Sequence, residues 1–156
     1  MTRSSYLRFY IFVVVTCLSP PLFSEGEQSP EDLVIAFITD YEQWNNEFIA
    51  LSKKLDALRV MDKAEFRYKQ ILKKYCKADI EHEAIAFAED PDHQSKSETI
   101  INSLPSGSFS RVTTTHTYKS GYHVNYEYLF HWDSNKKRWY LEHIYSLQPE
   151  GKIDTL

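Results

Sequence analysis

The residues from Ser108 to Leu147 constrain the fold most, because two tight reversals there separate three runs of alternating side chains. The middle run, His123 to Trp132, alternates strictly, which is typical of a β-strand with two different faces. One face holds Val124, Tyr126, Tyr128, Phe130 and Trp132, and the other holds His123, Asn125, Glu127, Leu129 and His131. The pattern predicts a three-stranded antiparallel meander whose aromatic face packs against the rest of the chain.

Two turns set the expected pairing of these strands. We place Ser120–Gly121 at the tip of the first hairpin, where glycine supplies a positive φ, and Asp133–Lys137 at the second reversal. The resulting pairs include His116 with Asn125, Thr114 with Glu127, Trp132 with Arg138 and Glu127 with His143. A carboxylate beside two imidazoles can abstract a proton or hold a metal ion, although a cross-strand Glu and His pair is more often a stabilising contact. A slip of one residue would put these groups on opposite faces.

The chain before the meander reads as helical cover for this sheet. Ser29 is a good N-cap, Pro30 suits the first helical position, and two acids follow. Apolar residues then recur every three or four positions from Leu33 to Leu58, which predicts one long amphipathic helix. A capping box with Asp62 as the cap predicts a second helix that ends near Lys77.

Two shorter elements are expected between the second helix and the meander. Residues Ile80 to Ala88 alternate with period two, which predicts a strand. Residues Ser97 to Leu104 predict a short helix that Pro105 to Gly107 terminates. Cys76 lies in the helical pattern before them, so we interpret it as a buried structural thiol.

Acidic residues are densest between the second helix and the meander. They are Asp79, Glu81, Glu83, Glu89, Asp90 and Asp92. Such a run is often only a solvated face, but it also suits a docking surface for a basic partner, because complementary charge guides encounter. The two histidines of this segment, His82 and His93, are expected at the surface.

Composition excludes several classes of function. The formal charge of the chain is −4, and removing residues 1–24, which hold Arg3 and Arg8 and no acid, would make it −6. A nucleic-acid binder would need a basic surface, so we expect none. The sequence has four glycines, no glycine-rich phosphate loop and no metal-binding or nucleophile motif, so we expect no cofactor and no metal.

The first 24 residues read as a secretory signal peptide. Arg3 and Arg8 precede the apolar run Phe9 to Leu18, which is short for a membrane span, and cleavage is expected after Ser24. Two alternatives stay open, namely an uncleaved anchor and a lipid attached to Cys17, either of which would tether the protein to a membrane. We therefore expect one domain, residues 25–156, in the periplasm or secreted. Removal of the signal leaves Cys76 without a partner for an intrachain disulfide.

The expected order of helix, helix, strand, short helix and three-strand meander resembles the nuclear transport factor 2-like fold over residues 29–148. That resemblance implies an α+β cone in which a long N-terminal helix and a second helix pack on a bent antiparallel sheet. Several segments are also similar to immunity proteins of bacterial polymorphic toxin systems that use this fold. These segments are Asp92-His93, Glu98-Thr99-Ile100-Ile101, Ser110-Arg111-Val112-Thr113-Thr114, Tyr126-Glu127-Tyr128-Leu129 and Lys137-Arg138-Trp139-Tyr140-Leu141.

The resemblance implies a protein that binds and neutralises a cognate toxin by stoichiometric occlusion, without catalysis. Its important residues would then be the six acids between Asp79 and Asp92, together with Tyr122 and Trp132 as aromatic anchors on the sheet rim. The alternatives are a small-molecule-binding module and an isomerase-like or dehydratase-like enzyme of the same fold. Either would use the pocket between helix and sheet, with Asp40, His116, Glu127 or His143 as its polar groups. Self-association into a homodimer also stays open.

Overall fold

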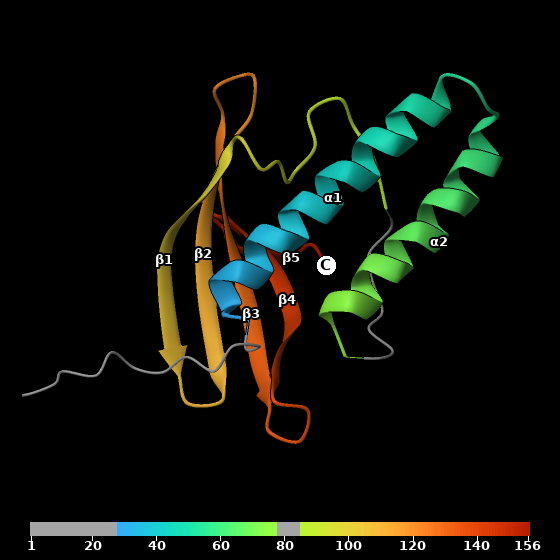
Figure 1. The fold of residues 1–156 in the computed structure, drawn as a ribbon. Helices are drawn as coiled ribbons and strands as arrows, with labels where there is room; N and C mark the ends of the chain where they lie inside the picture. The colour runs from blue at the N-terminus through green and yellow to red at the C-terminus, as the bar shows by residue number, and fades with distance from the viewer. Residues whose placement is uncertain (1–27, 78–84) are drawn as a thin grey trace, which may run out of the picture.

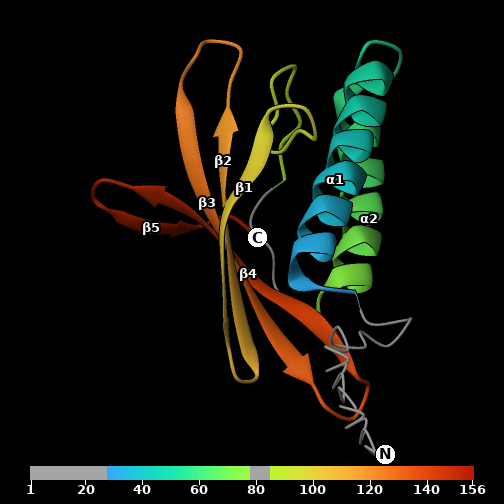
Figure 2. The ribbon, with the colours of Figure 1, turned by 60° about the vertical axis from the view of Figure 1, so that its left-hand side comes forward.

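A computed structural model describes residues 28–77 and 85–156 of the chain. Two helices, α1 (Pro30–Ser52) and α2 (Ala57–Tyr75), lie in one layer on one side of an antiparallel sheet (Figures 1 and 2). The sheet contains five strands, β1 (Glu98–Ser106), β2 (Phe109–Thr117), β3 (His123–Asp133), β4 (Arg138–Gln148) and β5 (Gly151–Asp154). They neighbour one another in chain order, so the sheet is an uninterrupted meander. The expected signal segment, residues 1–24, lies outside the described residues.

The start of α1 confirms the prediction made from Ser29 and Pro30. The Ser29 hydroxyl accepts the N–H of Asp32 at 3.1 Å, and the Asp32 carboxylate accepts the N–H of Ser29 at 3.3 Å. These reciprocal bonds satisfy two backbone donors that have no partner within the helix. The helix therefore begins where the sequence places it.

The predicted end of this helix is wrong, and so is the predicted start of the next one. α1 stops at Ser52, and Asp56 caps α2 by accepting the N–H of Arg59 at 3.1 Å. The apolar spacing continues through the turn only by coincidence, because Leu58 is 73% exposed. An aspartate cap is sufficient to end one helix and start another without glycine or proline. Asp62 consequently lies inside α2.

The helices pack antiparallel to each other, and α1 packs on the sheet. The Trp44 indole donates a hydrogen bond to the carbonyl of Ala64 at 3.0 Å, which ties α1 to α2. On the other side, Phe37 lies edge-on to Tyr128 of β3, with ring centroids 6.2 Å apart. Val124, Tyr126, Tyr128 and Phe130 are all buried, so the aromatic face of β3 forms core, as predicted. Burial of each such side chain stabilises the fold by about 1.5–3 kcal/mol.

The strand β1 replaces the short helix that was predicted for Ser97 to Leu104. Its residues pair with β2 from Glu98 opposite His116 to Ser106 opposite Phe109, with one irregularity after Ile100. β-Branched residues suit this extended conformation, and tertiary pairing overrides a weak helical pattern. Pro105 is tolerated because β1 is an edge strand. The short strand β5 was not predicted at all.

The predicted pairing of the first hairpin is displaced by one residue. The Tyr118 N–H donates to the carbonyl of Tyr122, and the Gly121 N–H donates to the carbonyl of Tyr118, each at 2.9 Å. These bonds define a three-residue loop whose last residue, Gly121, has φ +83°. Such a loop is a common alternative to the two-residue turn. His116 therefore lies opposite Val124, and Thr113 rather than Thr114 lies opposite Glu127.

The second hairpin also differs from its prediction by one residue. Trp132 pairs with Trp139, and the register of β3 against β4 shifts once more between Leu129 and Phe130. This irregularity places Tyr145, rather than His143, opposite Glu127. Because side chains alternate between the faces of a strand, a displacement of one residue changes which groups can meet.

The strand predicted for Ile80 to Ala88 is not formed in the part of it that the structure describes. Residues 78–84 lie outside the described part, and residues 85–88 have no regular secondary structure. The buried amide of Asn45 bonds both backbone groups of Ala88, donating to its carbonyl at 2.8 Å and accepting its N–H at 2.9 Å. The Asn45 side chain on α1 thus supplies the backbone hydrogen bonds that a neighbouring strand would otherwise supply to Ala88.

Cys76 confirms the interpretation of a buried thiol. It is 3% exposed and follows α2, where it bridges to Leu141 of β4. Burial raises the pKa of the Cys76 thiol to about 12. A thiol with that pKa is protonated at neutral pH and is a poor nucleophile.

Candidate functional site

A buried polar cluster lies between α1 and the sheet. It consists of His93, Glu98, Thr114 and Tyr128, all of them buried. Glu98 is its centre, because its Oε1 accepts hydrogen bonds from the Thr114 hydroxyl at 2.5 Å and from the Tyr128 hydroxyl at 2.7 Å. Its Oε2 lies 2.9 Å from Nδ1 of His93. All of these hydrogen-bond partners of the Glu98 carboxylate are therefore buried groups of the protein.

The charge of Glu98 is stabilised in spite of its burial. Loss of hydration alone would raise the pKa of the Glu98 carboxyl, but His93 and the hydrogen bonds from Thr114 and Tyr128 lower it below the ordinary value. Burial, together with the neighbouring carboxylate, raises the pKa of the Tyr128 hydroxyl well above its ordinary value. Tyr128 is thus a hydrogen-bond donor to an ionised Glu98.

The expectation that His93 lies at the surface is wrong. The residue is 3% exposed, and its ring packs against Tyr126 and edge-on against Tyr41, with centroids 4.6 Å and 5.0 Å away. The sequence held one signal for a buried polar cluster. Thr114 and His116 alternate with Val112, a core residue, so these polar side chains share its buried face of the strand. Polar residues on a buried face need partners, and Glu98 and His93 supply them to Thr114 and Tyr128.

The three titratable groups expected to converge on one face of the sheet do not meet. His116 is fully buried on the core face, where its Nδ1 lies 3.4 Å from the Ser97 hydroxyl. Its Nε2 has no hydrogen-bond partner among the described residues, and burial lowers the pKa of its imidazole. Glu127 and His143 lie on the other face of the sheet, away from the helices, because they alternate with the core residues Tyr128 and Ile144. The changed pairing thus moved His116 alone to the core face.

Glu127 and His143 make separate contacts on that outer face. The Glu127 carboxylate contacts Arg111 at 3.1 Å and Lys152 at 2.5 Å, and its side chain is 6% exposed. His143 pairs with Asp154 at 2.7 Å. Neither contact includes the other residue, so the predicted Glu127 and His143 pair is not formed.

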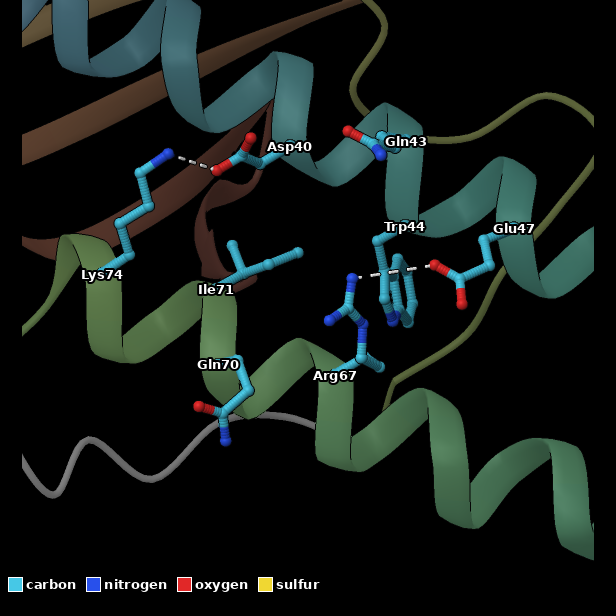
Figure 3. Close-up of a pocket in the computed structure, with 8 residues that line it drawn as sticks. All are labelled: Asp40, Gln43, Trp44, Glu47, Arg67, Gln70, Ile71 and Lys74. Atoms are coloured by element: carbon cyan, nitrogen blue, oxygen red, sulfur yellow. Dashed lines mark hydrogen bonds and ion pairs between the residues drawn. The ribbon is translucent and has the colours of Figure 1, made fainter.

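Asp40, the fourth predicted pocket group, faces α2 rather than the sheet. Its Oδ2 accepts hydrogen bonds from Lys74 at 2.7 Å and from the Tyr75 hydroxyl at 2.8 Å. Figure 3 shows Asp40 and Lys74 pointing toward each other across a surface pocket of about 180 Å³ between the two helices. At the other end of this pocket Arg67 and Glu47 lie 3.9 Å apart. The carboxylate of Asp40 thus joins the helices.

A cavity of about 220 Å³ adjoins the buried polar cluster. Its walls include His93 and the aromatic side chains of Tyr41, Trp44 and Tyr68, and Ala86 and Leu156 complete part of the lining. Asp92 and Asp154 also line it, so aromatic rings, one imidazole and two carboxylates surround a space suited to a small polar molecule.

A larger groove of about 510 Å³ lies at the rim of the sheet. We call it the rim groove. It is lined by residues of the loop before β1, of the β2–β3 hairpin and of the β4–β5 hairpin, namely Asp90, Asp92, Tyr118, Ser120, Tyr122, Val124, Tyr126, Ser146, Gln148, Ile153 and Thr155. Three residues predicted to bind a partner, Asp90, Asp92 and Tyr122, therefore come together here from segments that are distant in sequence.

Hydrogen bonds hold the acidic side of the rim groove in place. Asp90 accepts the N–H of Lys119 at 2.9 Å and the amide of Gln94 at 2.9 Å. Loss of hydration raises the pKa of the Asp90 carboxyl, but these bonds outweigh it and lower the pKa below the ordinary value. Asp92 accepts the hydroxyl of Tyr118 at 2.6 Å. Hydrogen bonds thus hold both carboxylates in place beside the hairpin.

The aromatic side of the rim groove is more accessible. Tyr122 is 58% exposed, and its ring stacks on Tyr118 with centroids 6.2 Å apart and planes inclined by 24°. The other predicted anchor, Trp132, lies at the opposite end of β3 and packs against Trp139 at 5.3 Å. Among the predicted acids, Glu89 forms only an exposed pair with Lys53 at 3.9 Å, while Asp79, Glu81, Glu83 and the nearby His82 lie outside the described residues.

No protein family, curated protein or solved structure matches the chain. Among residues 28–77 and 85–156, no group of three or more His, Cys, Asp or Glu side chains is placed to hold a metal ion. Neither α1 nor α2 is long and apolar enough to cross a membrane.

Proposed function

We propose that this protein is an immunity protein of the nuclear transport factor 2-like fold, secreted or periplasmic, that neutralises a toxin by binding it through the rim groove. The observation that carries this proposal is the convergence of Asp90, Asp92 and Tyr122 in one groove. The arrangement of two helices on one side of a five-stranded antiparallel meander supports the fold. A long N-terminal helix, a second helix and a C-terminal antiparallel meander agree with the order expected of such a cone, whereas β1 stands where a short helix was expected.

The distribution of titratable groups favours binding over catalysis. The best acid and base of the interior, Glu98 and His93, are bonded to each other and almost entirely buried. The other candidates lie in three separate places, with Asp40 between the helices, His116 in the core and Glu127 on the outer face. An enzyme needs its acid and base within reach of one substrate, whereas a stoichiometric inhibitor needs only a complementary surface.

The chemistry of the rim groove indicates a basic partner. Two fixed carboxylates offer charge-assisted hydrogen bonds to lysine or arginine side chains, and the Tyr118 and Tyr122 rings offer faces on which a guanidinium can stack. Exposed tyrosines at the centre of an interface commonly contribute most to affinity. The carboxylates would mainly speed association, so binding should weaken as salt concentration rises.

Replacing Tyr122 by alanine is expected to weaken toxin binding by about tenfold or more, since an interface aromatic at the centre of a contact contributes roughly 2 kcal/mol. The measurement uses the C-terminal domain of the protein that the neighbouring gene encodes. The purified domain is titrated with this protein, and survival of cells that co-express the two is recorded. Phe66→Ala is the matched control, because Phe66 is 64% exposed on α2, away from the rim groove. Equal affinity for Tyr122→Ala and the unmodified protein would overturn the assignment of the groove. Absence of any protection by the unmodified protein would overturn the immunity function.

A second candidate function is the binding of a small molecule in the cavity beside His93. Aromatic walls of Tyr41, Trp44 and Tyr68 favour it, and Glu98 behind His93 would orient the imidazole for such a ligand. Ala86→Trp separates the two functions, because the larger side chain fills the cavity without removing a group of the buried polar cluster. We expect protection against the toxin to survive this substitution if the circular dichroism spectrum is unchanged. Loss of protection in a folded Ala86→Trp protein would favour the cavity instead.

A further inference from the structure

Three cationic side chains gather around one tyrosine at the end of the sheet opposite the rim groove. The Tyr140 ring centroid lies 4.4 Å from the guanidinium carbon of Arg138, 5.6 Å from Nζ of Lys136 and 6.0 Å from Nζ of Lys77. We call this group the basic cluster. Tyr140 is 6% exposed, whereas the three cations are exposed. The ring therefore forms a buried floor beneath positive charges that face solvent.

No carboxylate neutralises the basic cluster through an ion pair among the described residues. The nearest acid is Asp133, which accepts the N–H groups of Lys136 and Asn135 at 3.1 Å and 3.0 Å. These bonds, together with the charges of Lys77 and Lys136, hold the pKa of the Asp133 carboxyl below its ordinary value, so one carboxylate offsets part of the charge of the three cations. Glu142 lies 3.9 Å from His131. Lys77 donates to Nδ1 of that same histidine at 3.2 Å. Three cations thus share one nearby carboxylate, that of Asp133, and the basic cluster keeps a net positive charge.

The chain holds these cations in position. The Asp133 hydrogen bonds shape the β3–β4 turn, and Lys137 adopts φ +50° there, which directs the chain into Arg138. The Arg138 guanidinium then donates to the carbonyl of Lys74 at 2.8 Å, which links the turn to the end of α2. A helix C-terminus favours nearby cations, which accounts for lysines on α2. The same effect accounts for Arg138, which bonds the Lys74 carbonyl, but not for Lys136, which belongs to the β3–β4 turn.

We propose that the basic cluster binds a multiply charged phosphoryl anion, such as the terminal phosphate of a small molecule. Like charges that converge on one ring repel each other, and an anion with at least two negative charges would relieve this repulsion. A planar guanidinium with two flanking ammonium groups matches the several oxygens of a phosphate. A single carboxylate would leave positive charge uncompensated.

This site is separate from the rim groove. The groove extends to Tyr126 of β3, whereas Tyr140 lies opposite His131 nearer the end of that strand, and five residues of extended strand span roughly 17 Å. The two sites also carry opposite charge, so one partner group cannot satisfy both. Loss of binding at one site therefore leaves the other measurable.

The test is calorimetric titration of the protein with pyrophosphate at low ionic strength, followed in parallel by tryptophan fluorescence, since Trp139 adjoins Arg138 in sequence. We expect saturable binding of one anion that weakens with added salt. The double substitution Lys136→Gln/Arg138→Gln should weaken it about a hundredfold, because each lost charge-assisted bond is worth about a factor of ten in affinity. Lys53→Gln/Lys54→Gln, which removes two exposed lysines after α1, is the matched control.

The source of the anion is tested with vesicles and with an acidic peptide. Unchanged pyrophosphate affinity in Lys136→Gln/Arg138→Gln, or an equal loss in the Lys53/Lys54 control, overturns the site. Binding to phosphatidylglycerol vesicles without binding to pyrophosphate overturns the small-molecule assignment in favour of a membrane surface. Binding of polyglutamate as tight as that of pyrophosphate overturns the preference for phosphoryl groups. Thermal unfolding of each variant shows that the compared proteins are folded.

Discussion

Replacing Glu98 by alanine is expected to lower the free energy of unfolding by about 3–5 kcal/mol, because it removes the common partner of a buried network. Thr114 and Tyr128 would each lose an acceptor, and His93 would lose its carboxylate. A domain of this size is stable by only about 5–15 kcal/mol, so the loss is a large part of the total. Urea unfolding followed by circular dichroism measures it.

Two further substitutions make this test specific. Glu150→Ala removes an exposed acid from the β4–β5 turn and should change the free energy of unfolding by less than about 0.5 kcal/mol. Glu98→Gln keeps an acceptor of the same shape but removes the charge, so its effect should lie between the two. If Glu98→Ala and Glu150→Ala unfold at the same urea concentration, the buried polar cluster does not stabilise the fold.

The second large effect is expected at alkaline pH. Burial raises the pKa of Tyr41, Tyr68, Tyr126 and Tyr128 far above the ordinary value of 10.0. These hydroxyls stay protonated in the folded protein but ionise in the unfolded chain. Their stabilising contribution is therefore complete below pH 10 and is lost as the pH rises further. Four such groups would lower the free energy of unfolding by about 5 kcal/mol for each pH unit well above 10.

Tyrosinate absorbance and circular dichroism, recorded together during titration with base, measure this effect. We expect the buried tyrosines to ionise in one cooperative step that coincides with loss of ellipticity. Tyr41→Phe removes one of the four hydroxyls and should reduce the slope of stability against pH by about 1.4 kcal/mol per pH unit. Ionisation of all tyrosines near pH 10 with unchanged ellipticity would show that these hydroxyls are accessible in the native protein.

The sequence predicted correctly those features of the fold that neighbouring residues alone decide. The cap at Ser29 begins a helix because its hydroxyl and Asp32 lie three residues apart. Strict alternation from Val124 to Phe130 sorts the side chains of β3 because the period of a strand is two. A break in a helix that needs no glycine or proline, at Asp56, was missed because the apolar spacing happens to continue across it.

The candidate site depended on pairings that local signals do not decide. An added loop residue at Gly121 and an irregularity after Leu129 moved His116 away from Glu127 and Glu127 away from His143. The buried polar cluster arose instead from His93 and Glu98, one of which was expected at the surface and the other in a helix. Asn45, 43 residues away from Ala88, determined the path of the chain into the sheet.

The sequence by itself determined the start of α1, the presence of a second helix, the three central strands and the aromatic core face, because hydrophobic period and capping act over a few residues. It also identified Asp90, Asp92 and Tyr122 one by one. Only the tertiary structure decided that these three share a groove and that Lys77 joins Lys136 and Arg138 around Tyr140. The physical reason is that strand pairing and the docking of α2 are long-range contacts, selected by the energy of the whole fold rather than by any local pattern.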